Sequence, residues 1–320
     1  MSVQSVRWGI IGPGKIAHKF VQGMREVPGA ILHAVASRTH AKAVDFAYTY
    51  GAENAYGSYL ELVQDPLVDV IYVATTNNAH YANVKLCLEH KKACLCEKPF
   101  TLQVSELEDL VSLATKNNVF LMEAMWTRFL PSILLLEKLV KQGELGEIQK
   151  IKANFGFNVQ FDSESRLFNP DLGGGALYDI GIYPVFFAMH FLGIPNSISA
   201  KALKTEEGVD VENNIVFAYK NGAQAFLESS FKRDLSCEAH IFGTKGTLSL
   251  ARMWHCPTQV SIKKGNVTKD ITPTYVGNGY NYEIIEVHNC LKSGKTQSNE
   301  MLLKKSVERM TILNEIMRFW

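Results

Sequence analysis

The chain has 320 residues, which is longer than a typical single domain and favours two domains. Apolar residues make up 47% of it and charged residues 20%, a mixture that is typical of a globular fold and excludes extensive disorder. The 33 basic and 32 acidic side chains leave a formal net charge of +1. A nucleic acid or an anionic membrane surface is therefore not expected as the main partner.

Cysteine usage and the amino terminus favour a cytoplasmic protein. The six cysteines are scattered and none forms a C-x-x-C pair, so reduced thiols are expected. Cys94 and Cys96 share one face of a predicted strand, but nothing nearby completes a tetrahedral zinc site, and no metal is expected. The opening residues MSVQSVRWGIIG contain no apolar stretch long enough for a signal peptide, and no run of about 18 apolar residues occurs.

In the first 124 residues, apolar strands alternate with helical patterns. The predicted strands are residues 6–11, 30–36, 68–75, 93–97 and 119–122, and the predicted helices begin at residue 16 or span 41–50, 79–89 and 104–116. This alternation is typical of a parallel sheet that is covered by helices on both faces. We therefore expect a doubly wound, Rossmann-like α/β domain over residues 1–124.

A glycine turn follows the first predicted strand. Gly12, Gly14 and Ala17 match G-x-G-x-x-A, with Lys15 and Ile16 between them. In a dinucleotide-binding fold, such a turn presents backbone N–H groups and a helix N-terminus to a pyrophosphate. An ordinary tight turn is the alternative, but a strand before it and a helix after it favour cofactor binding.

The end of the second predicted strand bears on the choice of cofactor. An NAD site usually has a carboxylate there, whereas this chain has Ser37 and Arg38. A hydroxyl and a guanidinium suit the 2′-phosphate of NADP, although Arg38 can also be read as a solvated residue at a helix start. We expect NADP as the preferred cofactor, with NAD possible.

Several motifs along the chain carry a family resemblance. They are Thr75-Thr-Asn-Asn-Ala-His80, Cys94-Leu-Cys-Glu-Lys-Pro99, Glu123-Ala-Met-Trp-Thr-Arg-Phe129, Gly173-Gly-Gly175, Asp179-Ile-Gly-Ile-Tyr183 and Gly243-Thr-Lys-Gly246. Together with the glycine turn, they resemble the Gfo/Idh/MocA oxidoreductases over nearly the whole chain. The stretches that begin at Glu123 and Asp179 look like the dihydrodiol dehydrogenase branch, which includes NADP-dependent D-xylose dehydrogenases.

The resemblance implies roles for residues of the first domain. Lys98 follows a predicted parallel strand, where ligands bind in open α/β sheets, and the resemblance implies a catalytic lysine before a cis proline. Without the resemblance, a solvated loop lysine would be the simpler interpretation. The other implied cofactor-binding residues are Thr75, Asn77, His80, Glu97, Lys98 itself, Trp126 and Arg128. His80 can also be read as a capping or surface histidine, and the family usually has proline where Thr76 stands.

Residues 125–320 change in character and predict an α+β domain with a large, mostly antiparallel open sheet. The predicted strands are residues 147–158, 197–204, 214–219, 223–232, 237–242 and 247–252, and the predicted helices are 131–142, 175–192, 282–291 and 300–320. A short turn such as Lys220-Asn-Gly222 is typical of antiparallel pairing. We expect this domain to bind substrate and to form the oligomer interface.

Asp179 and Tyr183 are four residues apart on a predicted helix and therefore share a face. The resemblance directs that face toward the nicotinamide, with Tyr183 as acid/base and Lys98 stabilising the oxyanion. A core tyrosine with its hydroxyl at the rim is the alternative. Many family members have histidine at this position, so Tyr183 favours the dihydrodiol branch.

These observations predict an NAD(P)-dependent oxidoreductase. It transfers a hydride between a nicotinamide cofactor and the CH–OH group of a small-molecule substrate, a sugar or a cyclic diol. The alternative is a dinucleotide-binding sensor of the same fold without turnover. The resemblance also implies a homodimer or a higher homo-oligomer.

Overall fold

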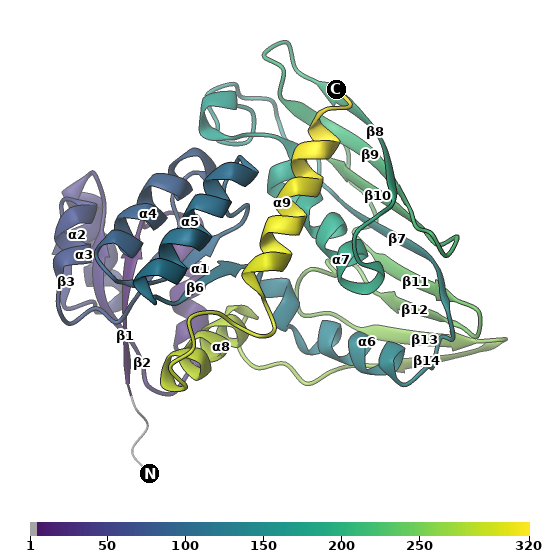
Figure 1. The fold of residues 1–320 in the computed structure, drawn as a ribbon, viewed down its shortest axis with the longest axis horizontal. Helices are drawn as coiled ribbons and strands as arrows, with labels where there is room; N and C mark the ends of the chain where they lie inside the picture. The colour runs from purple at the N-terminus through teal and green to yellow at the C-terminus, as the bar shows by residue number, and fades with distance from the viewer. Residues whose placement is uncertain (1–4) are drawn as a thin grey trace. The chain divides into compact units, whose positions relative to one another are not determined.

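The computed structural model describes residues 5–320 and divides the chain into two compact units (Figure 1). The first unit contains the chain up to Trp126 together with Val276–Val307, and the second contains Thr127–Tyr275 together with Glu308–Trp320. The chain therefore passes from one unit to the other three times.

The first unit is built on a parallel sheet. Its strands are β1 (Val6–Ile11), β2 (Ala30–Ala36), β3 (Asn54–Tyr56), β4 (Val70–Val73), β5 (Ala93–Glu97) and β6 (Leu121–Ala124), in the spatial order β3-β2-β1-β4-β5-β6. Its helices include α1 (Lys15–Met24), α2 (His40–Tyr50), α3 (Tyr59–Gln64), α4 (His80–Glu89), α5 (Val104–Asn117) and α8 (Tyr280–Lys292). The order reverses between β1 and β4, which is where open α/β sheets bind ligands.

Burial of both sheet faces explains why these strands are almost entirely apolar. Every residue of β4 and β5 is buried. Between β1 and α1, the ring of Phe20 stacks on Tyr72 with 3.7 Å between centroids and meets the edge of Trp8 at 5.3 Å. The parallel α/β domain expected from the alternating pattern is thus confirmed.

The second unit contains a broad, mixed sheet. Its strands are β7 (Ile148–Gly156), β8 (Ser197–Lys204), β9 (Asp210–Ala218), β10 (Gln224–Ser230), β11 (Ala239–Gly243), β12 (Thr247–Leu250), β13 (Val260–Lys264) and β14 (Val267–Ile271), in the order β14-β13-β12-β11-β7-β10-β9-β8. The pair β7–β10 is parallel and its other neighbouring pairs are antiparallel. The antiparallel β9–β10 hairpin turns at Lys220–Gly222 as expected, with Gly222 at φ +83°.

The remaining helices of this part of the chain are α6 (Pro131–Lys141), α7 (Ile182–Leu192) and α9 (Leu303–Met317). Helix α7 packs on β7 and β10 (Figure 1). Within residues 5–320, the segment Pro170–Leu192 is long and apolar enough to cross a membrane, but 72% of its most apolar window is buried inside the fold. That burial is typical of a core helix.

The structure differs from the sequence-based expectations in several places. In the first unit, strand β3 and helix α3 were not among the expected elements. The helix expected over residues 175–192 begins with a π-helical turn, Leu177–Gly181, before α7. Strands β13 and β14 were not among the expected strands. Helix α8, expected in the domain 125–320, packs in the first unit, where it contacts α1 and where Trp8 Nε1 donates to His288 Nε2 at 3.0 Å.

Candidate active site

The glycine turn joins β1 to α1 at the carboxyl edge of the parallel sheet. Gly12 has φ +87°, and a Cβ on it would lie 3.0 Å from the carbonyl oxygen of Ala74. Gly14 is the N-cap of α1, no side chain caps it, and a Cβ there would meet no atom within 4 Å. The N–H groups in the first turn of α1, including those of Lys15 and Ile16, therefore lie next to an open surface that fits a pyrophosphate.

Ser37 and Arg38 directly follow β2 on the same edge. Ser37 is 8% exposed, and its Oγ accepts a hydrogen bond from Thr39 N at 3.2 Å. Arg38 is exposed, and among residues 5–320 no ion pair is formed by its guanidinium. A free cation at this strand end suits a phosphate better than a ribose diol.

His80 links the segment that follows β4 to the segment that follows β5 through its two ring nitrogens. This side chain is fully buried, its Nδ1 lies 2.8 Å from the carbonyl oxygen of Pro99, and its Nε2 lies 3.2 Å from that of Thr75. Burial lowers the pKa of His80, because the charged imidazolium loses its hydration there. Asn83 adds a bond from its Nδ2 to Thr75 Oγ1 at 3.1 Å, while Asn77 is half-buried in the loop that leads into α4.

Glu97 ends β5, and Lys98 directly follows it. The Lys98–Pro99 peptide bond is cis, as the resemblance implied. Tyr72 donates a short hydrogen bond to Glu97 Oε1, and Lys98 N donates to Glu97 Oε2 at 3.2 Å. Since Lys98 is half-buried and Glu97 is 6% exposed, the lysine is the more accessible of the two.

Trp126 and Arg128, on either side of the boundary between the two units, fall in different units. Trp126 ends the first stretch of the first unit and stacks on Tyr280 with 4.5 Å between ring centroids. Arg128 belongs to the second unit, is 4% exposed, and lies 3.4 Å from Glu137 through its Nη2. The structure thus gives Arg128 a half-buried partner on α6 that sequence reasoning did not anticipate.

Asp179 and Tyr183 lie on the helical segment of the second unit. Asp179 falls inside the π-helical turn and accepts a bond from Arg166 Nη1 at 2.9 Å. Tyr183, in the first turn of α7, is 6% exposed, with its ring centroid 5.1 Å from His255 and 5.8 Å from Phe155. Neither of these two aromatic neighbours was singled out from the sequence, because both are distant along the chain and carry no motif.

The first unit therefore collects one set of predicted residues at one edge of its sheet. Those that follow strands β1, β2, β4, β5 and β6 are Gly12, Gly14, Ser37, Arg38, Thr75, Asn77, Lys98 and Trp126. Asp179, Tyr183 and Arg128 belong to the second unit. Among the described residues, no group of three or more His, Cys, Asp or Glu side chains is arranged to hold a metal ion.

A glycine turn at the carboxyl edge of a doubly wound sheet defines a dinucleotide-binding class of protein. Residues 6–125 match the model of the oxidoreductase family with an NAD-binding Rossmann fold, and residues 133–249 match that of the GFO/IDH/MocA C-terminal domain. The chain belongs to the Gfo/Idh/MocA oxidoreductase family, as the EKP motif indicated, and is an NAD(P)-dependent dehydrogenase.

Named relatives and solved structures are similar over nearly the full length. The trans-1,2-dihydrobenzene-1,2-diol dehydrogenase of Xenopus tropicalis is 37% identical, with 98% of each chain covered, and that of Homo sapiens is 35% identical, with 98% of this chain and 96% of the human one covered. A 3-ketoreductase from Actinomadura kijaniata, solved with NADP and TDP-benzene, has a TM-score of 0.89 at 24% identity over 98% and 97% of the chains. An aldose-aldose oxidoreductase from Caulobacter crescentus has a TM-score of 0.90 at 22% identity over 99% and 97%.

Proposed function

We propose that this dehydrogenase transfers a hydride between NADP and the CH–OH group of a sugar or a cyclic diol. The observation that carries the proposal is the placement of Lys98 at the carboxyl end of β5, on the sheet edge that also presents the glycine turn and Arg38. The relatives named as dihydrodiol dehydrogenases and the aldose oxidoreductase of similar fold support this substrate class.

We assign the cofactor contacts to the first unit as follows. The N–H groups of Lys15 and Ile16 would hold the pyrophosphate at the turn formed by Gly12 and Gly14, where Gly14 N donates to Gly12 O at 2.8 Å. Ser37 with Arg38 would hold the 2′-phosphate. Glu97 would accept hydrogen bonds from the nicotinamide ribose. Around these, Thr75, Asn77 and Trp126 are assigned direct contacts. His80 and Arg128 are assigned supporting roles, because the His80 ring contacts the carbonyl oxygens of Pro99 and Thr75 and Arg128 pairs with Glu137.

The chemistry is divided between the cofactor and three side chains. When bound, the nicotinamide accepts or supplies the hydride. Tyr183 Oη, as the phenolate, takes the proton of the substrate hydroxyl in the oxidising direction, and the resulting phenol returns it in the reducing direction. Lys98 Nζ donates a hydrogen bond to the same substrate oxygen and stabilises its negative charge, as an ammonium does for any adjacent anion. Asp179, held by Arg166, supplies a second polar group on the segment that carries Tyr183.

Turnover assays with matched tyrosine variants test the proposal. The purified protein is mixed with NADP and a panel of aldoses and cyclic diols, and the absorbance of reduced nicotinamide is followed. Tyr183→Phe is expected to lower kcat by at least about a hundredfold, as loss of a general base does. The control Tyr178→Phe removes a hydroxyl from the same helical segment, where it bonds Asn314 at 3.1 Å, and should retain activity.

Three outcomes would each contradict a part of the proposal. Full activity of Tyr183→Phe would remove this tyrosine from the mechanism. A protein that binds NADP but turns over no member of the panel would favour the sensor alternative instead. Tighter binding of NAD than of NADP by the parent protein would overturn the cofactor preference.

Assembly and location complete the proposal. We propose a homodimer formed through the exposed face of the broad sheet, where Leu203 and Phe226 are 52% and 38% exposed. Light scattering on the purified protein tests this, and a monomer at micromolar concentration would overturn it. We also propose a cytoplasmic location, because the six cysteines are free thiols within the described residues.

A further inference from the structure

A buried carboxylate lies at the start of the helical segment that carries Asp179 and Tyr183. Asp210 begins β9 and is 5% exposed, and its Oδ2 accepts a hydrogen bond from Leu177 N at 2.7 Å. Leu177 is the first residue of the π-helical turn. The first N–H groups of a helix have no partner within the helix, so Asp210 satisfies one of them and places negative charge at the positive end of the helix dipole.

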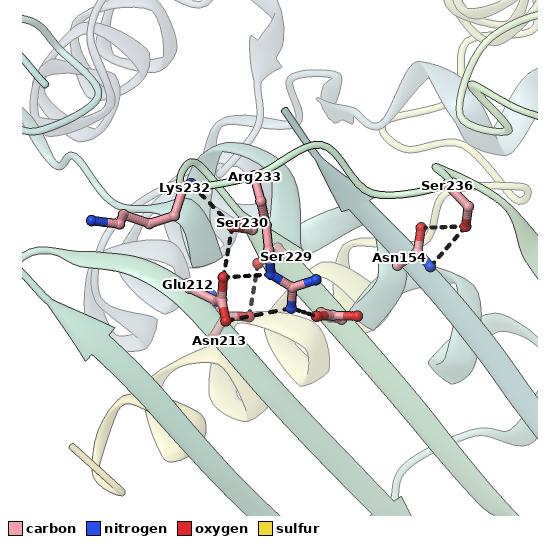
Figure 2. Close-up of polar contacts among 9 residues, drawn as sticks. Asn154, Glu212, Asn213, Ser229, Ser230, Lys232, Arg233 and Ser236 are labelled. Carbon is pink, nitrogen blue, oxygen red and sulfur yellow. Dashed lines mark hydrogen bonds and ion pairs between the residues drawn. The ribbon is translucent and has the colours of Figure 1, made fainter. Parts of the chain in front are cut away.

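Two neighbouring polar residues fix Asp210 in turn. Asn213 Nδ2 donates to the same Asp210 oxygen at 2.9 Å, and Ser229 Oγ donates to Asn213 Oδ1 at 2.7 Å. Asn213 and Ser229 are fully buried and lie directly opposite each other on β9 and β10 (Figure 2). The carboxylate is therefore held by the sheet and does not depend on the helix for its position.

Two glycines allow the helical segment to approach this network closely. A Cβ on Gly175 would lie 2.3 Å from Asp210 Oδ1, and a Cβ on Gly181 would lie 2.8 Å from Ser229 Oγ. Both separations are too short for any side chain, so each position requires glycine. The glycines lie just before and at the end of the π-helical turn, and the turn is thus held against the polar network at both points.

We propose that Asp210 is a positioning residue for Asp179 and Tyr183. The inference rests on the proposed function, because it takes Tyr183 as the proton-transferring group. Asp179 lies inside the π-helical turn and Tyr183 follows that turn by two residues. Since an isolated π-helical turn is rare and less favourable than a regular helix, contacts from outside must hold it. Without the bond to Leu177 N, the turn relaxes and both side chains change direction.

For the position of the π-helical turn, the hydrogen bonds that Asp210 accepts contribute more than its negative charge. Burial is the largest influence and raises the pKa of Asp210, while the bonds from Leu177 and Asn213 lower it. An amide of the same shape presents an oxygen to both donors without a buried charge. Asp210→Asn should therefore preserve the position of the turn, whereas Asp210→Ala should not.

Steady-state kinetics with three variants test the inference. We expect Asp210→Ala to lower kcat by about tenfold or more, since a misplacement of about 1 Å can cost a hundredfold, while the KM for NADP stays within about twofold. Asp210→Asn should stay within about threefold of the parent kcat. The control Glu212→Ala lies on the same strand but pairs with Arg233 at 3.1 Å and should not change kcat (Figure 2).

A double-mutant cycle separates this inference from the proposed function. If Asp210 acts through Tyr183, Asp210→Ala should lower the residual single-turnover rate of Tyr183→Phe by less than about twofold. Additive losses, or a folded Asp210→Ala protein with the parent kcat, would overturn the positioning role. A Tyr183→Phe protein with full activity would instead refute the proposed function. Should Asp210→Ala fail to fold, Ser229→Ala is measured in the same way, and a parent-like kcat in that variant would also overturn the inference.

Discussion

Replacing Glu283 by glutamine should make the stability of the protein less dependent on pH. Glu283 lies in the first turn of α8, is fully buried, and has no hydrogen-bond partner for either carboxylate oxygen within residues 5–320. Burial, and secondarily the nearby Glu97, raises the pKa of Glu283 well above its ordinary value of 4.5. The amide has the same shape and does not titrate.

The sign and size of the effect follow from proton binding. Above pH 4.5 the unfolded chain has lost the Glu283 proton while the folded chain still holds it. The folded state then binds one more proton, so the free energy of unfolding falls as pH rises, by at most about 1.4 kcal/mol per pH unit. This decline stops once pH passes the raised pKa. The difference in stability between Glu283→Gln and the parent should therefore grow with pH in favour of the variant.

Urea unfolding of the two proteins at several pH values between about 5 and about 8 measures this difference. The fluorescence of Trp8 and Trp126 reports on the unit that contains α8. The control Glu89→Gln changes an exposed acid on α4 and should show no such trend. A stability difference that is independent of pH, or one that grows in favour of the parent, would refute the reasoning, because it would mean that the buried carboxylate is charged and partnered.

Two further predictions concern residues assigned to the cofactor site, one through NADP affinity and one through stability. Arg38→Asp should weaken NADP binding by about tenfold or more, because it removes one charge-assisted contact to the phosphate. The control Arg7→Asp lies at the opposite end of the neighbouring strand and should leave NADP binding unchanged. Equal NADP affinity of both variants in a fluorescence titration would contradict the assignment. Gly12→Ala should lower the free energy of unfolding by about 1–3 kcal/mol. The alanine would have to adopt the left-handed φ of +87°, and its Cβ would lie 3.0 Å from Ala74 O. A urea midpoint unchanged from the parent would contradict this prediction.

The sequence predicted elements best where periodicity and burial agree. The strands β1, β2, β5 and β8 have the expected bounds, because each is flanked by turn residues and three of them are largely buried. Strand β14 was missed because VTKDI is a polar, exposed edge strand, and β13, which lies between β12 and β14, was missed because VSIKK has only two apolar residues and ends in two exposed lysines. The π-helical turn was also missed, since Asp210, which accepts the hydrogen bond of its first residue Leu177, lies 33 residues further along the chain.

For the candidate site too, some features could be predicted from the sequence and others could not. The position of Gly12, Ser37 and Lys98 after parallel strands could be predicted, because sequence order defines the carboxyl ends of such strands. The burial of His80 and Arg128 could not be read from the sequence, since it depends on Pro99, Thr75 and Glu137 folding around them. The roles of Tyr183 and Asp179 remain predictions.

The return of α8 to the first unit means that the nucleotide-binding half is not a contiguous stretch of chain. Ile284 and Val287 on this helix are fully buried, and His288 accepts the indole N–H of Trp8. A fragment that ends at residue 126 would lack this cover and would expose an apolar patch over α1 and β1. Autonomous expression of the dinucleotide-binding half thus requires residues 276–307 to be grafted back, and simple truncation should give an aggregating product.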